Sequence, residues 1–171
     1  MKKLIILGAG GYGRTVADVA QQIGKWDEIF FLDDNSQNAK VIGKCADFSR
    51  FIDADTQFYP AFGDNSARSQ WLYRLAEAGC DIPTIVHGTA YVSPAAVLKT
   101  GAVVLPMAVV NTECVVTEGC IINCGAVIDH GCVIERCVHV CPGAVIKAEN
   151  RIAEGSKIES GTFVQARTFK V

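Results

Sequence analysis

The sequence predicts an α/β unit with a small parallel sheet over residues 1–82, followed by a parallel β-helix over residues 83–171. The first unit is indicated by β-branched stretches that alternate with helix-like stretches across glycine turns, as in a β-α-β unit. The second is indicated by aliphatic residues at every sixth position from Val86 to Val164, a period that fits neither a helix nor a hairpin strand. The stretch "DIPTIVHGTAYVSP" separates the two patterns with prolines. We therefore expect two domains in one chain.

The elements of the first unit follow in a regular order. "KKLIIL" predicts a strand, "GAGGYG" a turn, the stretch after it a helix, and "EIFFLDD" a second strand. "QFYPAF" predicts a third strand, and the helix that follows "GDN" places Trp71, Leu72 and Leu75 on one face. Together these elements predict a Rossmann-like parallel sheet flanked by helices.

The turn after the first strand has the spacing G-x-G-x-x-G, with Gly8, Gly10 and Gly13 as its glycines. Such a turn opens a helix whose N-terminal N–H groups can hold a phosphate. Asp33 and Asp34 follow about twenty residues later at a strand end, where a ribose or a base can be held. The turn therefore predicts a nucleotide site, although a glycine turn also serves tight packing alone. A dinucleotide redox cofactor is less favoured, because residues 1–82 make only half of a doubly wound fold.

The second unit repeats three kinds of position. The position two residues before each aliphatic residue holds a small side chain in almost every repeat. The position three residues before it is often glycine. Three hexads close one coil, so equivalent positions stack every eighteen residues and Cys114 lies beneath Cys132 inside the solenoid. The aliphatic positions are Val86, Val92, Leu98, Val104, Val110, Val116, Ile122, Ile128, Ile134, Val140, Ile146, Ile152, Ile158 and Val164.

Composition excludes several classes of partner. The 16 basic residues against 18 acidic ones leave no basic face for nucleic acid or an anionic membrane. Glycines interrupt the apolar N-terminal stretch too early for a signal peptide or a membrane span, so we expect a cytoplasmic protein. The eight cysteines contain no C-x-x-C pair and are interpreted as buried thiols rather than as zinc ligands or disulfides.

Five stretches together resemble one bacterial family: "GAGGYG", "FLDD", "FGDN", "IVHGTAYVSP" and "NCGAVIDHGCVIERCVHVCPGA". They are similar to the NeuD/PglD-type sugar O- and N-acetyltransferases, especially those that act on UDP-linked 4-amino sugars. The resemblance implies a nucleotide-sugar-binding N-terminal domain and a left-handed β-helix. It also implies acetyl-CoA as the acetyl donor, no metal, and a homotrimer with active sites between subunits.

Carried to this chain, the resemblance assigns residues of the β-helix to acetyl transfer. It makes His130 the general base, Asp129 its neighbouring acid and Asn123 an organising amide. The chemistry agrees, because an amine that attacks a thioester must lose a proton, and an imidazole can take it near neutral pH. The resemblance makes His139 a hydrogen-bond donor near the acetyl thioester, and it places Gly143 and Ala148 at acetyl-CoA as well.

The resemblance also assigns the nucleotide-sugar site. The sequence departs from the family pattern in three respects: Tyr12 stands where relatives usually have histidine, Glu149 stands where glycine is common, and the repeats stop about one coil early. The first departure concerns recognition of the amino sugar, and the other two predict weaker acetyl-CoA binding. The residues implied to bind the sugar nucleotide are Gly8, Gly10, Gly11, Tyr12, Gly13, Asp33, Asp34, Gly63 and Asn65.

Other interpretations remain open at this stage. The acceptor can be a hydroxyl, as in sialic acid O-acetyltransferases, or the protein can be a non-catalytic nucleotide-sugar scaffold. A zinc enzyme of the γ-carbonic anhydrase type is disfavoured, because it needs three histidine ligands and the spacing of His87, His130 and His139 does not fit. Without the resemblance, we would interpret His130 as an exposed corner residue and Asn123 as an amide that bonds its own backbone in a turn.

The two central histidines are half a coil apart. His130 and His139 are separated by nine residues, so in one chain they should lie on opposite sides of the triangular solenoid. In a cyclic trimer, however, one side of each solenoid faces a neighbour. We therefore expect the two histidines to meet only across a subunit interface.

Overall fold

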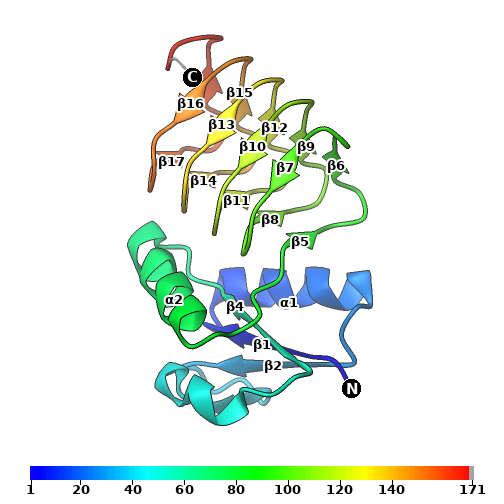
Figure 1. Ribbon diagram of the computed structural model, residues 1–171, viewed down its shortest axis with the longest axis vertical. Helices are drawn as coiled ribbons and strands as arrows, with labels where there is room; N and C mark the ends of the chain where they lie inside the picture. Colours follow the sequence, from blue (N-terminus) through cyan, green and yellow to red (C-terminus); the bar gives the residue numbers. More distant parts are fainter. Residues whose placement is uncertain (170–171) are drawn as a thin grey trace. The chain divides into compact units, whose positions relative to one another are not determined.

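The computed structural model describes residues 1–169. The chain divides into two compact units, Met1–Pro83 and Thr84–Val171. Each unit has its own layout, and Figure 1 labels most of the elements of both.

The N-terminal unit is built on a four-stranded parallel sheet in the order β3-β2-β1-β4. Two expected helices are present, and a short strand and a 3-10 helix that the sequence did not predict lie between β2 and β4. Leu4 to Leu7 are fully buried, which explains the continuous apolar run of the central strand. The elements are β1 Lys3–Leu7, α1 Gly11–Ile23, β2 Glu28–Leu32, β3 Val41–Gly43, η1 Cys45–Phe51, β4 Thr56–Pro60 and α2 Asn65–Glu77.

The two helices have clear start and stop signals. Helix α1 follows Gly10 and ends at Gly24, whose φ of 67° is the left-handed conformation that favours glycine at a C-cap. Helix α2 starts after Asp64, whose side chain accepts a 2.7 Å hydrogen bond from the Ala67 N–H. Leu72 and Leu75 of α2 are buried as expected. Neither helix, nor any other in the part that the structure describes, is long and apolar enough to span a membrane.

The C-terminal unit is a left-handed parallel β-helix of two-residue strands, as predicted (Figure 1). We name its three sheets by their strands: sheet I is β17-β14-β11-β8-β5, sheet II is β18-β15-β12-β9-β6, and sheet III is β16-β13-β10-β7. The strands are β5 Ile85–Val86, β6 Tyr91–Val92, β7 Val97–Leu98, β8 Val103–Val104, β9 Val109–Val110, β10 Val115–Val116, β11 Ile121–Ile122, β12 Val127–Ile128, β13 Val133–Ile134, β14 His139–Val140, β15 Val145–Ile146, β16 Arg151–Ile152, β17 Lys157–Ile158 and β18 Phe163–Val164.

The register confirms the eighteen-residue coil. Val115 pairs with Val133, and Ile121 pairs with His139, each one coil further along. The small and aliphatic positions of successive coils form one buried core. Cys114 and Cys132 lie in this core with no exposed surface.

Five polar members of the small column also donate side-chain hydrogen bonds along the solenoid. Each of these five donates to the carbonyl oxygen fifteen residues later, at the same corner of the next coil. The bonds are Thr84 Oγ1 to Lys99 O at 3.1 Å, Cys114 Sγ to Asp129 O at 3.0 Å, Cys120 Sγ to Glu135 O at 2.9 Å, Cys132 Sγ to Lys147 O at 3.2 Å and Asn150 Nδ2 to Gln165 O at 2.8 Å. The cysteines therefore satisfy corner carbonyls in addition to filling space.

Asn150 provides a stability prediction. Its fully buried amide also donates to Lys147 O at 2.7 Å, and its oxygen accepts from the Phe169 N–H at 2.9 Å. Replacing Asn150 by Ala leaves several of these buried groups without partners, so we expect a loss of about 3 kcal/mol in the free energy of unfolding. Asn150→Cys, which restores the thiol donor used at Cys132, should lose less. Urea unfolding at one protein concentration measures the free energy of unfolding of both variants. Equal losses in Asn150→Ala and Asn150→Cys would contradict the proposed role of the hydrogen bonds.

Candidate active site

The glycine turn after β1 contains two glycines that the fold itself requires. Gly8 has a φ of 99°, and a Cβ built on it would lie 3.0 Å from the carbonyl oxygen of Ala61. A Cβ on Gly13 would lie 1.9 Å from the carbonyl oxygen of Gly8, so only glycine lets α1 approach the turn. Gly10 and Gly11, by contrast, have no atom within 4 Å of such a Cβ. These two positions leave open space before the N-terminus of α1, where a phosphate can approach.

Asp33, directly after β2, holds this turn in place. Its Oδ2 accepts a 2.7 Å hydrogen bond from the Ala9 N–H, and its Oδ1 accepts from the N–H groups of Asn35 and Ser36 at 2.8 and 2.6 Å. Partial burial acts to raise the pKa of this carboxyl, but these backbone donors outweigh burial and hold the pKa below its ordinary value. The carboxylate therefore ties the turns after β1 and β2 together.

The turn after β4 is organised by Arg68, a residue that sequence reasoning missed. The Arg68 side chain is fully buried; it donates to Phe62 O at 2.8 Å and to Asn65 Oδ1 at 2.7 Å. A signal was available, because an arginine at 68 occupies the same helix face as Leu72 and Leu75. Gly63 of this turn is exposed. Asn65 thus contributes its side-chain oxygen to the turn itself.

Tyr12 and Asp34 complete the predicted nucleotide residues. The Tyr12 hydroxyl lies 2.9 Å from the hydroxyl of Tyr59, on β4. Burial, and then the neighbouring Tyr59, raise the pKa of Tyr12 well above its usual value, so the phenol stays neutral. Asp34 is exposed, and its Oδ1 accepts from the Cys45 N–H at 3.0 Å.

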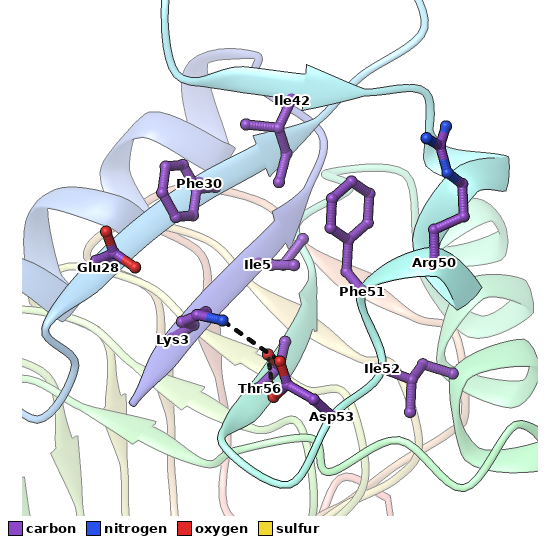
Figure 2. Close-up of a pocket in the computed structure, with 10 residues that line it drawn as sticks. All are labelled: Lys3, Ile5, Glu28, Phe30, Ile42, Arg50, Phe51, Ile52, Asp53 and Thr56. Carbon is purple, nitrogen blue, oxygen red and sulfur yellow. Dashed lines mark hydrogen bonds and ion pairs between the residues drawn. The ribbon is translucent and has the colours of Figure 1, made fainter. Parts of the chain in front are cut away.

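These turns follow three neighbouring parallel strands, in the order β2-β1-β4. Their carboxyl ends lie at one edge of the sheet, which is where open α/β sheets bind ligands. A separate hollow of about 510 Å³ lies on a face of the same sheet, toward the amino ends of its strands (Figure 2). Ile5 and Phe30 line it, and an ion pair of 3.3 Å between Lys3 Nζ and Asp53 Oδ2 crosses its border. We place the candidate nucleotide site at the carboxyl edge and not in this hollow.

In the β-helix, His130 occupies the exposed corner between sheets II and III. Its N–H donates to Asp129 Oδ1 at 2.8 Å, and its carbonyl accepts from the Glu149 N–H at 3.0 Å. Asp129 Oδ1 also lies 3.5 Å from Asn111 Nδ2. The Asp129 carboxylate thus holds the corner backbone, and within residues 1–169 no hydrogen bond joins it to the His130 ring.

His139 begins β14 on the outward side of sheet I, beside the corner between sheets I and II. Its Nε2 lies 3.1 Å from Nδ2 of Asn123, whose Oδ1 accepts from the Cys124 N–H at 2.8 Å. Because the amide oxygen faces Cys124, the NH₂ group faces the ring and Nε2 accepts. Asn123 is both a turn amide and the partner of His139.

The two remaining residues predicted for acetyl-CoA lie at different corners. Gly143 is in the corner between sheets I and II, one coil after Gly125, and its N–H donates to Cys124 O at 3.0 Å. Ala148 is in the corner between sheets II and III, on the side of His130. The structure thus groups Asn123, His139 and Gly143 at one corner of the chain. It groups Asp129, His130 and Ala148 at another.

Sheet II separates these two corners and has an apolar outward face. We call this outward column the apolar ladder; its members are Tyr91, Val109, Val127, Val145 and Phe163. Tyr91 and Phe163 are 54% and 55% exposed, although both are large apolar side chains. An apolar stripe of this length on a sheet is typical of a surface that another protein surface covers.

One ion pair beside His130 was also missed from the sequence. Arg167 donates two hydrogen bonds of 2.8 Å to the carboxylate of Glu149. The signal was the coil period, since the two residues are eighteen positions apart. For metals, residues 1–169 contain no group of three or more His, Cys, Asp or Glu side chains placed to hold an ion.

Comparisons with known proteins identify relatives of both units. Residues 3–75 match the PglD N-terminal domain family. Over 110 residues the chain is 30% identical to the UDP-N-acetylbacillosamine N-acetyltransferase of Bacillus subtilis (strain 168). This alignment covers 60% of the chain and 51% of the relative, so it spans about half the length of that relative.

Solved structures extend the likeness to both units. The acetyltransferase domain of PglB from Neisseria gonorrhoeae FA1090 has a TM-score of 0.95 and 35% identity, over 98% of this chain and 84% of that domain. The same domain solved with acetyl coenzyme A gives 0.94 and 36%, over 97% and 83%. PerB from Caulobacter crescentus, solved with CoA and GDP-perosamine, shares the fold with a TM-score of 0.74 and 20% identity, over 96% of this chain and 92% of PerB. With a PglD-type N-terminal domain, a hexapeptide β-helix and this identity to the PglB domain, the chain belongs to the NeuD/PglD-type family of sugar acetyltransferases.

Proposed function

We propose that this protein transfers the acetyl group of acetyl-CoA to an amino group of a nucleotide-linked amino sugar. The observation that carries the proposal is the 36% identity, over 97% of the chain, to an acetyltransferase domain solved with acetyl coenzyme A. A UDP-sugar is favoured, because the relative named for a UDP-linked substrate is 30% identical. PerB, solved with a GDP-sugar, is only 20% identical.

In this proposal each of the two units binds one substrate. Residues 1–82 bind the nucleotide sugar, with the open N-terminus of α1 at Gly10 and Gly11 facing the phosphates. We assign Tyr12, Asp34 and Gly63, which follow β1, β2 and β4 in the chain, to the same site. Residues 83–171 bind acetyl-CoA and carry out the transfer.

His130 acts as the general base. It is exposed at its corner, so an acceptor can reach the ring, and imidazole can take the proton that the amine loses as it attacks the thioester carbonyl. Asp129 positions His130 through the backbone, because its carboxylate accepts the His130 N–H. At the other corner, Asn123 holds His139 and keeps a second amide N–H for the developing negative charge on the carbonyl oxygen.

The two corners form one site only if a second copy of the chain supplies the other half. We propose a cyclic homotrimer in which the apolar ladder of sheet II is covered by a neighbouring subunit. The ladder lies between the two corners, so covering it brings the His130 corner of one subunit toward the His139 corner of the next. Three active sites then lie between subunits.

The test of the function is release of free CoA thiol from acetyl-CoA with a panel of UDP-, GDP-, dTDP- and CMP-linked sugars. Each sugar is supplied with an amino or a hydroxyl group at the same carbon. We expect turnover with the UDP-linked amino sugar. Turnover only with the hydroxyl sugars would make the enzyme an O-acetyltransferase, and no turnover with any sugar would support a non-catalytic scaffold.

Asp33 provides a prediction for the nucleotide site. In Asp33→Asn the new NH₂ group faces backbone N–H donors, so the glycine turn loses its fixed position. We expect the KM for the sugar nucleotide to rise about tenfold or more, because misplaced binding groups are costly. The KM for acetyl-CoA should stay unchanged. Asp53→Asn, which disturbs a turn at the amino ends of the strands, is the matched control. Equal rises in both KM values would contradict the assignment.

A further inference from the structure

The peptide unit that joins Asp129 to His130 is held at both of its polar ends. Its N–H, which belongs to His130, donates to Asp129 Oδ1 at 2.8 Å. Its carbonyl oxygen, which belongs to Asp129, accepts from the thiol of Cys114 at 3.0 Å. A peptide unit is rigid and planar, so two hydrogen bonds at opposite ends fix the orientation of its plane. That plane sets the direction in which the His130 side chain leaves the corner.

Cys114 makes its hydrogen bond from inside the solenoid. Its side chain has no exposed surface, and it lies one coil before Cys132 in the small column. Cys132 does not duplicate this contact, because its Sγ lies 3.2 Å from Lys147 O and 3.8 Å from His130 O. The shorter bond of Cys132 therefore goes to the following coil, and Cys114 is the thiol that holds the peptide unit before His130.

The fold does not require a thiol at this kind of position. In the corner between sheets II and III the donors Cys114, Cys132 and Asn150 follow one another in successive coils. In the corner between sheets I and II the corresponding positions are Ala90, Ala108, Ala126 and Ala144. Alanine thus closes a coil as well as cysteine does, and the donors gather at the corner that carries His130.

We propose that Cys114 is a positioning residue for His130, which it orients by fixing the peptide unit that precedes it. This inference rests on the proposed function, in which His130 is the general base. A general base must lie within hydrogen-bond reach of the proton that it removes, and a small misplacement lowers the rate strongly. Cys114 itself is buried and touches no substrate, so it acts only through the backbone.

Two substitutions separate the hydrogen bond of Cys114 from its volume. Cys114→Ala removes the donor and should lower kcat by about tenfold, with both KM values little changed. Cys114→Ser supplies a hydroxyl donor, which can make this bond because Thr84 Oγ1 donates to Lys99 O at 3.1 Å over the same fifteen residues. We therefore expect Cys114→Ser to recover most of the lost kcat. Serine and alanine are both smaller than cysteine, so a space-filling role alone predicts no such recovery.

Cys120 provides the matched control. It also has no exposed surface, and it donates to Glu135 O at 2.9 Å in the corner between sheets III and I. Cys120→Ala removes the same atoms and the same kind of bond from the same core, so its loss in the free energy of unfolding in urea should be similar to that of Cys114→Ala. Because His130 lies at another corner, Cys120→Ala should leave kcat unchanged.

NMR signals of the imidazole rings, recorded without substrates, report the position of His130 independently of turnover. In Cys114→Ala the His130 signals should shift, whereas the signals of His87 and His139 should stay in place. Cys114→Ser should return the His130 signals toward their positions in the wild type. Cys120→Ala should leave the His130 signals unchanged.

His130 signals and kcat that change together in Cys114→Ala, and recover together in Cys114→Ser, support the inference. The inference is overturned if Cys120→Ala has the same effects, if serine is no better than alanine, or if kcat stays unchanged in Cys114→Ala while His130→Ala is inactive. A His130→Ala variant with full turnover would instead remove the base role from the proposed function. The imidazole signals would then decide by themselves whether Cys114 orients His130.

Discussion

In the proposed homotrimer, His130→Ala should lower kcat by about a hundred- to ten-thousand-fold, the range that general bases contribute. His139→Ala homotrimers should be similarly inactive, because Asn123 then loses the ring that accepts its amide hydrogen at 3.1 Å. When the two variants are unfolded and refolded together in equal amounts, activity should return. In a cyclic trimer about three-quarters of the assemblies are mixed, and each mixed trimer rebuilds one of three sites, so about a quarter of wild-type activity is expected.

The recovery depends on the two histidines belonging to different subunits. In one chain, His130 lies at the corner between sheets II and III, and His139 lies beside the corner between sheets I and II, with sheet II between them. Native mass spectrometry confirms that subunits have exchanged. If exchanged trimers are no more active than either parent, the site is built within one subunit, and the shared-interface proposal is wrong.

The fold could be predicted in detail where the sequence repeats. Every two-residue strand of the β-helix follows from the six-residue period, because each coil can bury its interior only against its neighbours. Strand β3 and η1 were not predicted, since Val41–Gly43 is too short to show a pattern and Cys45–Phe51 mixes polar and aromatic residues without a helical period. The hydrogen bonds of Cys114, Cys120 and Cys132 were also not predicted. A thiol among small buried residues is normally interpreted as filling space in the core, so its donor role is not apparent from the sequence.

The candidate site was less accessible to sequence reasoning than the fold. A motif names residues but not the atoms that their side chains engage. Asp33 was expected to hold a ribose, yet its oxygens accept three backbone N–H groups. No motif marks Arg68; the one signal was its helical spacing from Leu72 and Leu75, which places an arginine on the buried face of α2. The pair of Glu149 and Arg167 was predictable in principle, since stacking at the coil period puts any two residues eighteen apart in contact.

The apolar ladder leads to the second prediction of large effect. Val127 lies at its centre, in β12, between Val109 and Val145 on neighbouring strands. In Val127→Asp each trimer would bury three carboxylates in apolar surroundings, and an unpaired charge cannot be buried without a cost of several kcal/mol. We expect the proposed trimer to dissociate at micromolar concentration, and kcat to fall by about a hundredfold or more, because each proposed site would lose the half supplied by its neighbour. Analytical ultracentrifugation measures the assembly, and the thiol-release assay measures turnover.

Two controls separate loss of assembly from loss of folding in this variant. The Val127 side chain points away from the solenoid core, whose neighbouring position in β12 is the fully buried Ile128. Far-UV circular dichroism of Val127→Asp should therefore match that of the wild type, whereas Ile128→Asp should unfold the coil. Val127→Ile, which keeps the ladder apolar, should remain trimeric and active. A Val127→Asp protein that stays trimeric with full turnover would show that the ladder faces solvent. The His130 and His139 corners would then have to be joined through a different face of the solenoid.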